Sequence, residues 1–313
     1  MNQARAVLLL PEAARFGAQS LKPGAAIALG RADRSQAHEP GRRAQLLRHF
    51  TPTPKHWPIA ALARQVDAGD AAGAVWLRAD PVHIRPDING ARLLAYGEAL
   101  GTGDEDREAL LPALRPLFGD AGFALDAPTP SHWYLRLPNG TRLPDFADPA
   151  QALGEDMFEH LAEGPEGRRW RALLSEAQVV LHNHPWNARR AQAGRAPINS
   201  LWFWGGGALP DTVVSEHALL CSDDEAAATL ARAACAAEPL PQRWREVERD
   251  TVFDLDAQRD LARLQQNWLI PALHSLSQGR LRMLDLDLAD GSGYRFARGQ
   301  RWRFWRKPRQ LGR

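Results

Sequence analysis

An apolar run that leads into three glycines constrains the fold of this chain more than any other stretch. The run is Leu201-Trp202-Phe203-Trp204, and Gly205, Gly206 and Gly207 follow it directly. A buried strand followed by bare backbone allows main-chain N–H groups to approach a bound anion. We therefore expect a buried strand at 201–204 whose end lies beside a ligand.

Side chains suited to an acidic ligand lie just before this run. Arginine presents a planar fork of donors that matches a carboxylate or phosphate, and asparagine can orient such a group. The glycines follow neither the GxxxxGK[ST] nor the GxGxxG pattern, so an ordinary turn after a buried strand is the alternative. The site that we predict for a small anionic metabolite comprises His184, Asn187, Arg189, Arg190, Asn199, Gly205, Gly206 and Gly207.

A second polar cluster lies on an alternating stretch that reads as a strand and its flank. It consists of Asp80, His83, Arg85 and Asp87. One histidine with two carboxylates can bind a metal ion, but an exposed strand face with local salt bridges is the favoured interpretation. Asp285, Asp287 and Asp290 lack the frame of a calcium loop, and we read them as the outer face of a strand and its turn.

Strand and helix patterns alternate along the chain and predict an α/β architecture. Residues 74–143 read as an inserted β-α-β-β subdomain, and residues 1–73 with 144–313 form the core. Residues 256–277 have helical periodicity, with a kink or break expected at Pro271. Ser222 to Glu225 has the form of a capping box that begins a helix over 223–237.

Composition excludes several classes of protein. The formal net charge of +2 gives no bulk attraction to nucleic acid or to an anionic membrane. No apolar run reaches the roughly 18 residues of a membrane span, and no signal-peptide pattern is present. Cys221 and Cys235 lack the spacing of a zinc site or a disulfide framework. We expect a cytoplasmic protein without a metal or other cofactor.

The tail Arg301–Lys307 alternates arginine with aromatic residues. This mixture is typical of proteins that bind single-stranded nucleic acid. The alternative, which we favour, is a last strand whose aromatic rings pack inward and make cation–π contacts.

The central block resembles a family signature. His184-Pro185-x-Asn187-x-x-Arg190-x-x-x-Gly194-x-x-Pro197-x-Asn199, then an apolar strand and Gly205-x-Gly207, is similar to a motif of archaeal-type, cofactor-independent phosphoglycerate mutases of the alkaline-phosphatase superfamily. Residues 74–143 resemble the β/α subdomain inserted in that family, and the resemblance implies an α/β core whose sheet has helices on both faces. The chain as a whole looks like a bacterial group labelled either phosphoglycerate mutase or RpfE-type regulatory protein.

The resemblance implies a catalytic apparatus that the sequence lacks. Such mutases hold two divalent metals with Asp and His residues and activate a serine nucleophile. Here the first strand ends in Pro11-Glu12 instead of Asp-Gly, and the region expected to hold the nucleophile is Arg42–Lys55. His217 and His274 match neither late metal motif. Phosphoryl transfer through two metals is therefore not expected.

Three functional hypotheses remain open. The first is a mutase-like binding or regulatory protein for a phosphorylated or carboxylate metabolite, with a protein partner left open. The second is a metal-dependent mutase or phosphatase that uses relocated ligands, for which the candidates are Asp80, His83, Asp87 and His184. The third is a partner-binding module whose packing or interface anchors are Trp202, Trp204, Trp302 and Trp305.

Overall fold

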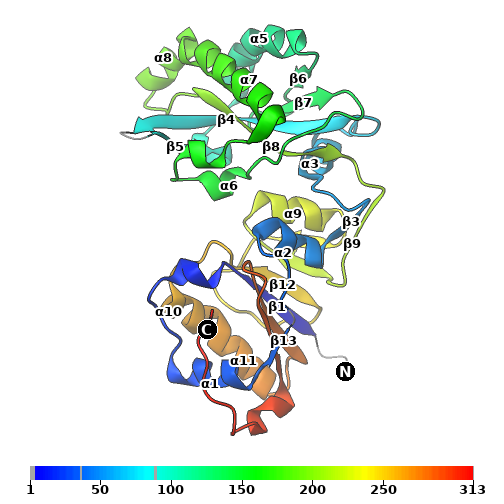
Figure 1. The fold of residues 1–313 in the computed structure, drawn as a ribbon, viewed down its shortest axis with the longest axis vertical. Helices are drawn as coiled ribbons and strands as arrows, with labels where there is room; N and C mark the ends of the chain where they lie inside the picture. The colour runs from blue at the N-terminus through cyan, green and yellow to red at the C-terminus, as the bar shows by residue number, and fades with distance from the viewer. Residues whose placement is uncertain (1–3, 36, 88–89, 313) are drawn as a thin grey trace. The chain divides into compact units, whose positions relative to one another are not determined.

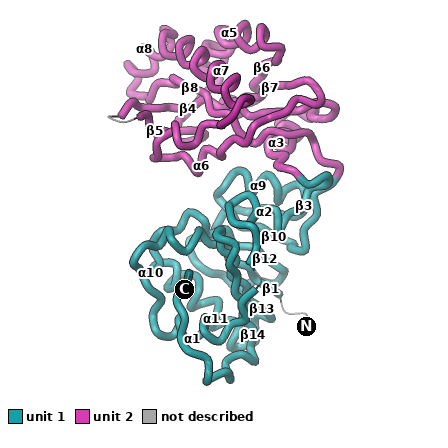
Figure 2. The backbone as a smooth tube through the Cα atoms, viewed as in Figure 1, with its two compact units in different colours: residues 1–55, 212–313 teal, residues 56–211 magenta. Residues whose placement is uncertain are grey.

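The computed structural model describes residues 4–35, 37–87 and 90–312, and the chain divides into two compact units. Unit 1 consists of residues up to 55 and from 212 onward, and unit 2 consists of residues 56–211 (Figure 2). The inserted unit is thus larger than the 74–143 that we expected. It extends to residue 211 because strand β8 (Ser200–Ala208) pairs with strand β4 (Val75–Asp87).

Unit 1 is built on a seven-stranded sheet in the order β11-β10-β12-β1-β13-β14-β2. Strands β11 to β13 of this order are parallel, and β14 and β2 are antiparallel additions. The strands are β1 (Arg5–Leu10), β2 (Asp33–Arg34), β10 (Leu219–Cys221), β11 (Ala236–Glu238), β12 (Thr251–Asp254), β13 (Met283–Leu288) and β14 (Gly293–Ala297). A separate antiparallel pair joins β3 (Thr51–Thr53) to β9 (Thr212–Val214).

The core of unit 1 lies between this sheet and a helical layer. Alternate residues of β1, Ala6, Leu8 and Leu10, are buried in one cluster with Leu29 and Trp268, as the two-residue period of a strand requires. The helices of unit 1 are η1 (Ala13–Phe16), α1 (Pro23–Arg31), α2 (Arg42–His49), α9 (Glu225–Arg232), α10 (Leu261–Leu264), the π-turn η3 (Gln265–Leu269), α11 (Ile270–Ser277) and η4 (Arg298–Trp302).

Two helices of unit 1 differ from their predicted form. The helix expected over 256–277 begins at Leu261, and a π-turn immediately precedes Pro271. Proline has no N–H to donate, so the break falls where we expected one. The helix expected over 223–237 covers only Glu225–Arg232, and its cap is Asp224, which accepts a hydrogen bond from the Ala227 N–H at 2.8 Å. The Ser222 hydroxyl accepts from the Asp224 N–H at 2.9 Å and does not cap the helix.

Unit 2 is organised around β4, a strand of 13 residues. It pairs antiparallel with β5, β7 and β8, and β6 extends the sheet beyond β7. In Figure 1, α5, α7 and α8 lie on one side of this sheet and α3 and α6 on the other. The remaining elements of unit 2 are α3 (Ile59–Asp67), β5 (Gly90–Tyr96), α4 (Gly97–Leu100), α5 (Asp104–Asp120), β6 (Ala124–Asp126), β7 (Tyr134–Leu137), α6 (Pro149–Ala152), η2 (Met157–His160), α7 (Gly164–His182) and α8 (Pro185–Gln192).

Both units are mixed α/β folds with sheets flanked by helices, as the sequence predicted. Within the described ranges, no helix has the length and apolar character needed to cross a membrane. The strand predicted for the tail was wrong, because residues 298–302 form a 3-10 helix and turns follow. The predicted cation–π contact is present between Arg301 and the Trp302 ring, at 4.9 Å. The rings of Trp302, Phe304 and Trp305 are 66%, 79% and 69% exposed.

The three glycines of the central block lie inside β8, so they do not follow the strand as we expected. A Cβ on Gly205 would lie 3.1 Å from the Ile59 Cβ, and one on Gly206 would lie 2.4 Å from Leu143. Gly205 also has a φ of 68°, beside an irregularity in the β4–β8 register. Close packing of neighbouring elements therefore accounts for these glycines.

We expect Gly205→Ala to destabilise the protein more than Gly194→Ala. Both glycines have positive φ, which costs an L-residue about 1 kcal/mol, but only Gly205 also faces a neighbour that a Cβ would crowd. Crowding of this kind adds about 1 to 3 kcal/mol. Urea unfolding of both variants measures the difference, and equal losses would show that packing at Gly205 is not the constraint.

Candidate functional site in unit 1

Helix α2 places a row of polar side chains over the sheet of unit 1. Arg42, Gln45 and His49 are three and four residues apart, so they lie on one face of the helix. This face meets Leu10, the last residue of β1, and Asp287, near the end of β13. Because β1, β12 and β13 are parallel, their carboxyl ends share one edge, where ligands of open α/β sheets bind.

Arg42 lies among three carboxylates at this edge. Its Nη2 is 2.5 Å from Asp254 and 3.8 Å from Asp224, and its Nε is 4.0 Å from Asp256. The Ser222 hydroxyl donates a further hydrogen bond to Asp254 at 2.6 Å. Burial disfavours the charged guanidinium, but the three carboxylates outweigh it and raise the pKa of Arg42 above its ordinary value.

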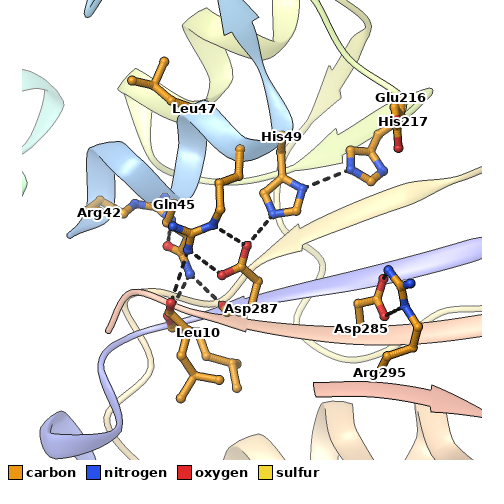
Figure 3. Close-up of polar contacts among 12 residues, drawn as sticks. Leu10, Arg42, Gln45, Leu47, His49, Glu216, His217, Asp285, Asp287 and Arg295 are labelled. Atoms are coloured by element: carbon orange, nitrogen blue, oxygen red, sulfur yellow. Dashed lines mark hydrogen bonds and ion pairs between the residues drawn. The ribbon is translucent and has the colours of Figure 1, made fainter. Parts of the chain in front are cut away.

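Gln45 connects this cluster to the next strand. It is fully buried, and its amide donates to the Leu10 carbonyl at 3.0 Å and to the Asp287 carbonyl at 2.7 Å. Its side-chain oxygen accepts a hydrogen bond from Arg42 at 2.9 Å (Figure 3). A single side chain thus fixes α2 against both β1 and β13.

A chain of hydrogen bonds continues from Asp287. Arg48 binds both of its carboxylate oxygens, at 2.6 and 3.1 Å, and His49 Nε2 lies 2.7 Å from one of them. His49 Nδ1 lies 3.1 Å from His217 Nε2 (Figure 3). Burial by itself would raise the pKa of Asp287, but the hydrogen bonds from His49 and Arg48 hold it below its usual value.

His217 is the last residue in this series of hydrogen bonds, and its imidazole is neutral. Burial, with His49 and Arg5 nearby, lowers its pKa to about 4. The side chain is buried, and its Nδ1 makes no hydrogen bond to any residue in the described ranges. In the tautomer in which His49 Nε2–H donates to Asp287 and His217 Nε2–H donates to His49 Nδ1, the Nδ1 of His217 is a bare acceptor.

A cavity of about 530 Å³ lies over the sheet beside this chain of hydrogen bonds. Arg48, His49 and Asp287 belong to both. Its charged and imidazole-bearing lining residues are Arg5, Asp33, Arg34, His38, Arg48, His49, Asp285, Asp287 and Arg295. Asp285 is bound by Arg5 at 2.6 Å and by Arg295 at 2.9 Å, and the lining holds four arginines and three carboxylates.

These residues do not fit the two metals that the family resemblance implies. A divalent ion needs several carboxylate or imidazole groups that converge on one point, and in the described part of the chain no three such side chains do so. Asp254 is already bound by Arg42 and Ser222. The guanidinium of Arg42 occupies the space among the acids.

The structure gives internal partners to the polar residues of the predicted anion site. Arg190 is buried and pairs with Asp106 at 2.5 Å, and it also donates to two backbone carbonyls. Asn187 is buried and closes a loop by bonding the Leu181 carbonyl and both backbone groups of Ile198. Arg190 and Asn187 therefore hold the fold together and do not face an open site.

The other members of that set are dispersed. Asn199 bonds both backbone groups of Ile84 and fastens β8 to β4. His184 caps α8, its Nδ1 accepting from the Trp186 N–H at 3.2 Å. Arg189 is exposed and lies over the Trp186 ring.

The second predicted cluster does not converge either. Asp80 is buried and accepts hydrogen bonds from Arg78 and from the Trp204 indole. His83 is bonded to the Pro197 carbonyl, and burial lowers its pKa. Asp87 makes a surface ion pair with Arg92, and Arg85 is exposed. We favoured an exposed strand face with local salt bridges. Asp87 fits this interpretation, whereas Asp80 is buried in the core.

The sequence contained a signal for the site in unit 1 that we did not use. Arg42, Gln45 and His49 recur at helical spacing within RRAQLLRH, next to broken and weakly helical sequence. Asp285 and Asp287 alternate with buried leucines and so share one face of β13, as expected. His217 lies in a loop, and no local pattern predicts its contact with His49.

We expect Arg190→Ala to lower the free energy of unfolding by about 3 kcal/mol, because it leaves the buried Asp106 carboxylate with fewer partners. Arg189→Ala, one residue earlier and exposed, is the matched control and should change stability by less than about 0.5 kcal/mol. Urea unfolding measures both variants. Equal effects would contradict the structural role of Arg190.

His217 should make the protein less stable in mild acid. Its pKa is about 4 in the folded state and 6.5 without perturbation, so between these values only the unfolded chain binds the proton. The free energy of unfolding therefore has its full value above pH 6.5. It falls as the pH drops, by about 1 to 2 kcal/mol between pH 7 and 5. His217→Asn should remove this part of the pH dependence in urea unfolding, and an unchanged slope would argue against a neutral, buried His217.

Comparisons with known proteins give relatives of one kind, although no family model matches the chain. It is 29% identical to a probable 2,3-bisphosphoglycerate-independent phosphoglycerate mutase of Geobacter sulfurreducens over 153 residues, 49% of this chain and 38% of the relative. It is 39% identical to such a mutase of Methanosarcina barkeri over 62 residues, 20% of this chain and 16% of the relative. A solved cofactor-independent mutase from Thermoplasma acidophilum has a TM-score of 0.43 at 14% identity and covers 95% of this chain and 90% of that one. The matches to the curated relatives thus span well under two thirds of the relatives' length, and what the chain resembles is a 2,3-bisphosphoglycerate-independent phosphoglycerate mutase.

Proposed function

We propose that this chain is a mutase-related binding protein of RpfE type, acting in the cytoplasm, that senses a small phosphorylated or carboxylate metabolite without transferring a phosphoryl group. The ligand would bind in the cavity of unit 1, and not at the block around Arg190 that the sequence suggested. A regulatory role follows if ligand binding is passed on to a protein partner.

The observation that carries this proposal is that arginine side chains supply the positive charge of the site. Four arginines line the cavity, namely Arg5, Arg34, Arg48 and Arg295. Arg42 lies outside this lining, where it pairs with Asp224, Asp254 and Asp256. A guanidinium binds an anion through oriented hydrogen bonds, but it has no open coordination position at which to activate water or a hydroxyl. Arginines at these positions therefore support the binding of an anion and not the transfer of a phosphoryl group.

The second candidate is a metal-dependent mutase or phosphatase. It is favoured by the similarity to a probable mutase over about half of the chain. The relocated ligands considered for it, Asp80, His83, Asp87 and His184, each have a local partner or lie apart. Metal-dependent turnover lost in Asp254→Asn or His184→Ala would support this candidate.

We expect 3-phosphoglycerate, inorganic phosphate or citrate to raise the melting temperature of the protein without added metal. Arg34→Ala and Arg295→Ala should weaken this effect because each removes a cation from the cavity lining. Loss of one charge-assisted contact should weaken binding by about tenfold. A thermal-shift titration in low salt measures the change.

Arg189→Ala is the control, since this exposed arginine belongs to unit 2 and should leave every titration unchanged. The same samples should hydrolyse neither 3-phosphoglycerate nor p-nitrophenyl phosphate in the presence of Mg²⁺, Mn²⁺ or Zn²⁺. Binding that persists in both cavity variants would refute the placement of the ligand. Turnover would refute the non-catalytic role.

A further inference from the structure

The end of the chain forms an exposed aromatic surface on unit 1. Trp302, Phe304 and Trp305 are each more than half exposed. The rings of Phe304 and Trp305 pack edge to face, with their centroids 5.4 Å apart. Clustered exposed aromatic rings are rare on soluble proteins outside interaction sites, because their transfer from water is favourable. We name this surface, with the adjoining cavity described below, the tail patch.

The backbone that bears these rings is fixed on both sides. Arg303 binds Asp33 at 2.5 Å and donates to the Arg31 carbonyl at 3.1 Å. Further on, the Arg309 N–H donates to the Ala26 carbonyl at 2.9 Å, and Gln310 accepts from the Leu21 N–H at 2.6 Å. The rings therefore face solvent on an anchored segment, and a partner would bind them without having to order the backbone first.

An apolar cavity of about 190 Å³ lies beside the segment that bears the rings, since Arg301 lines the cavity and its guanidinium lies 4.9 Å from the centre of the Trp302 ring. It lies between α1, α11 and η4, the last of which is the red segment beside α1 and α11 in Figure 1. Its apolar lining is formed mainly by aliphatic side chains, namely Ile27, Ala28, Leu273 and Leu276, together with Phe296. Arg301, which lines the cavity, directly precedes Trp302 in the chain.

The charge around the tail patch is mainly positive, although Asp33 pairs with Arg303. Every charged residue after Asp290 is basic, although the whole chain carries a net charge of only +2. Arg31, Arg298 and Arg301 line the cavity itself. The buried Nε of Arg31 makes no hydrogen bond to any residue within the described ranges, so one donor of the lining lacks an acceptor.

We propose that the tail patch binds an acidic segment of a partner protein that inserts an apolar side chain into the cavity. The apolar lining accepts an aliphatic or aromatic anchor, the arginines pair with flanking carboxylates, and the exposed indoles contact the segment next to the anchor. Single-stranded nucleic acid would use the rings but not this cavity, whose mainly aliphatic walls offer little surface on which a base can stack. The tail patch is separate from the anion cavity of the proposed function and does not depend on it.

A synthetic peptide in which glutamate alternates with leucine and phenylalanine tests the proposal. Its fluorescein-labelled form should bind the full chain in an anisotropy titration, more weakly as salt is added. A peptide with alanine in place of its apolar residues, and one with lysine in place of glutamate, should not bind. The double variant Trp302→Ala/Trp305→Ala and the variant Ile27→Asp should each bind at least about tenfold more weakly.

Phe158→Ala is the matched control, because Phe158 is 60% exposed but belongs to unit 2. It should bind the peptide as the wild type does, and all variants should keep the wild-type melting temperature since the substituted side chains lie at the surface or on the wall of an open cavity. Oligo(dT) and phosphatidylserine vesicles are tested in parallel. The proposal is overturned if the peptide does not bind, if binding survives in both patch variants, or if either alternative probe binds more tightly.

Discussion

The pairing of Arg42 with Asp254 is the contact on which the polar architecture of unit 1 depends. Asp254 ends a central parallel strand and is almost wholly buried, so its charge requires a counter-charge inside the protein. Arg42 supplies it from the first turn of α2, and Gln45 and His49 follow on the same face of the helix. The position of α2 on the sheet is thus set by hydrogen bonds as much as by apolar burial.

Unit 2 also supplies an arginine counter-charge for each of two buried carboxylates. Arg78 with Asp80, and Arg190 with Asp106, are ion pairs whose side chains are at most 5% exposed. Asp80 also binds the indole of Trp204, and Asp106 that of Trp186, so that each carboxylate has several donors. Such pairs fix which elements meet, because no apolar neighbour can replace a missing guanidinium without leaving a charge unpaired.

Element types were predictable from the sequence where periodicity was strong. The first strand, which ends before Pro11, and the alternating stretch that holds Asp80 and Asp87 are examples, and both are strands in the structure. The role of Arg190 was not predictable, because a signature of arginine, asparagine and glycine suits an anion site and a tightly bonded loop equally well. The partner that decides between them, Asp106, lies 84 residues away in the chain. The same holds for His217, whose contact with His49 spans 168 residues.

The β3–β9 ladder allows the two units to be produced as separate proteins. Thr53 and Thr212 are directly paired, so the chain leaves unit 1 and re-enters it at adjacent points. A short turn between these two positions closes the ladder as a hairpin and removes the whole of residues 56–211. Unit 1 can thereby be made as one uninterrupted polypeptide that still carries Arg42, the cavity beside α2 and the aromatic tail, and unit 2 can be tested separately with the same ligands.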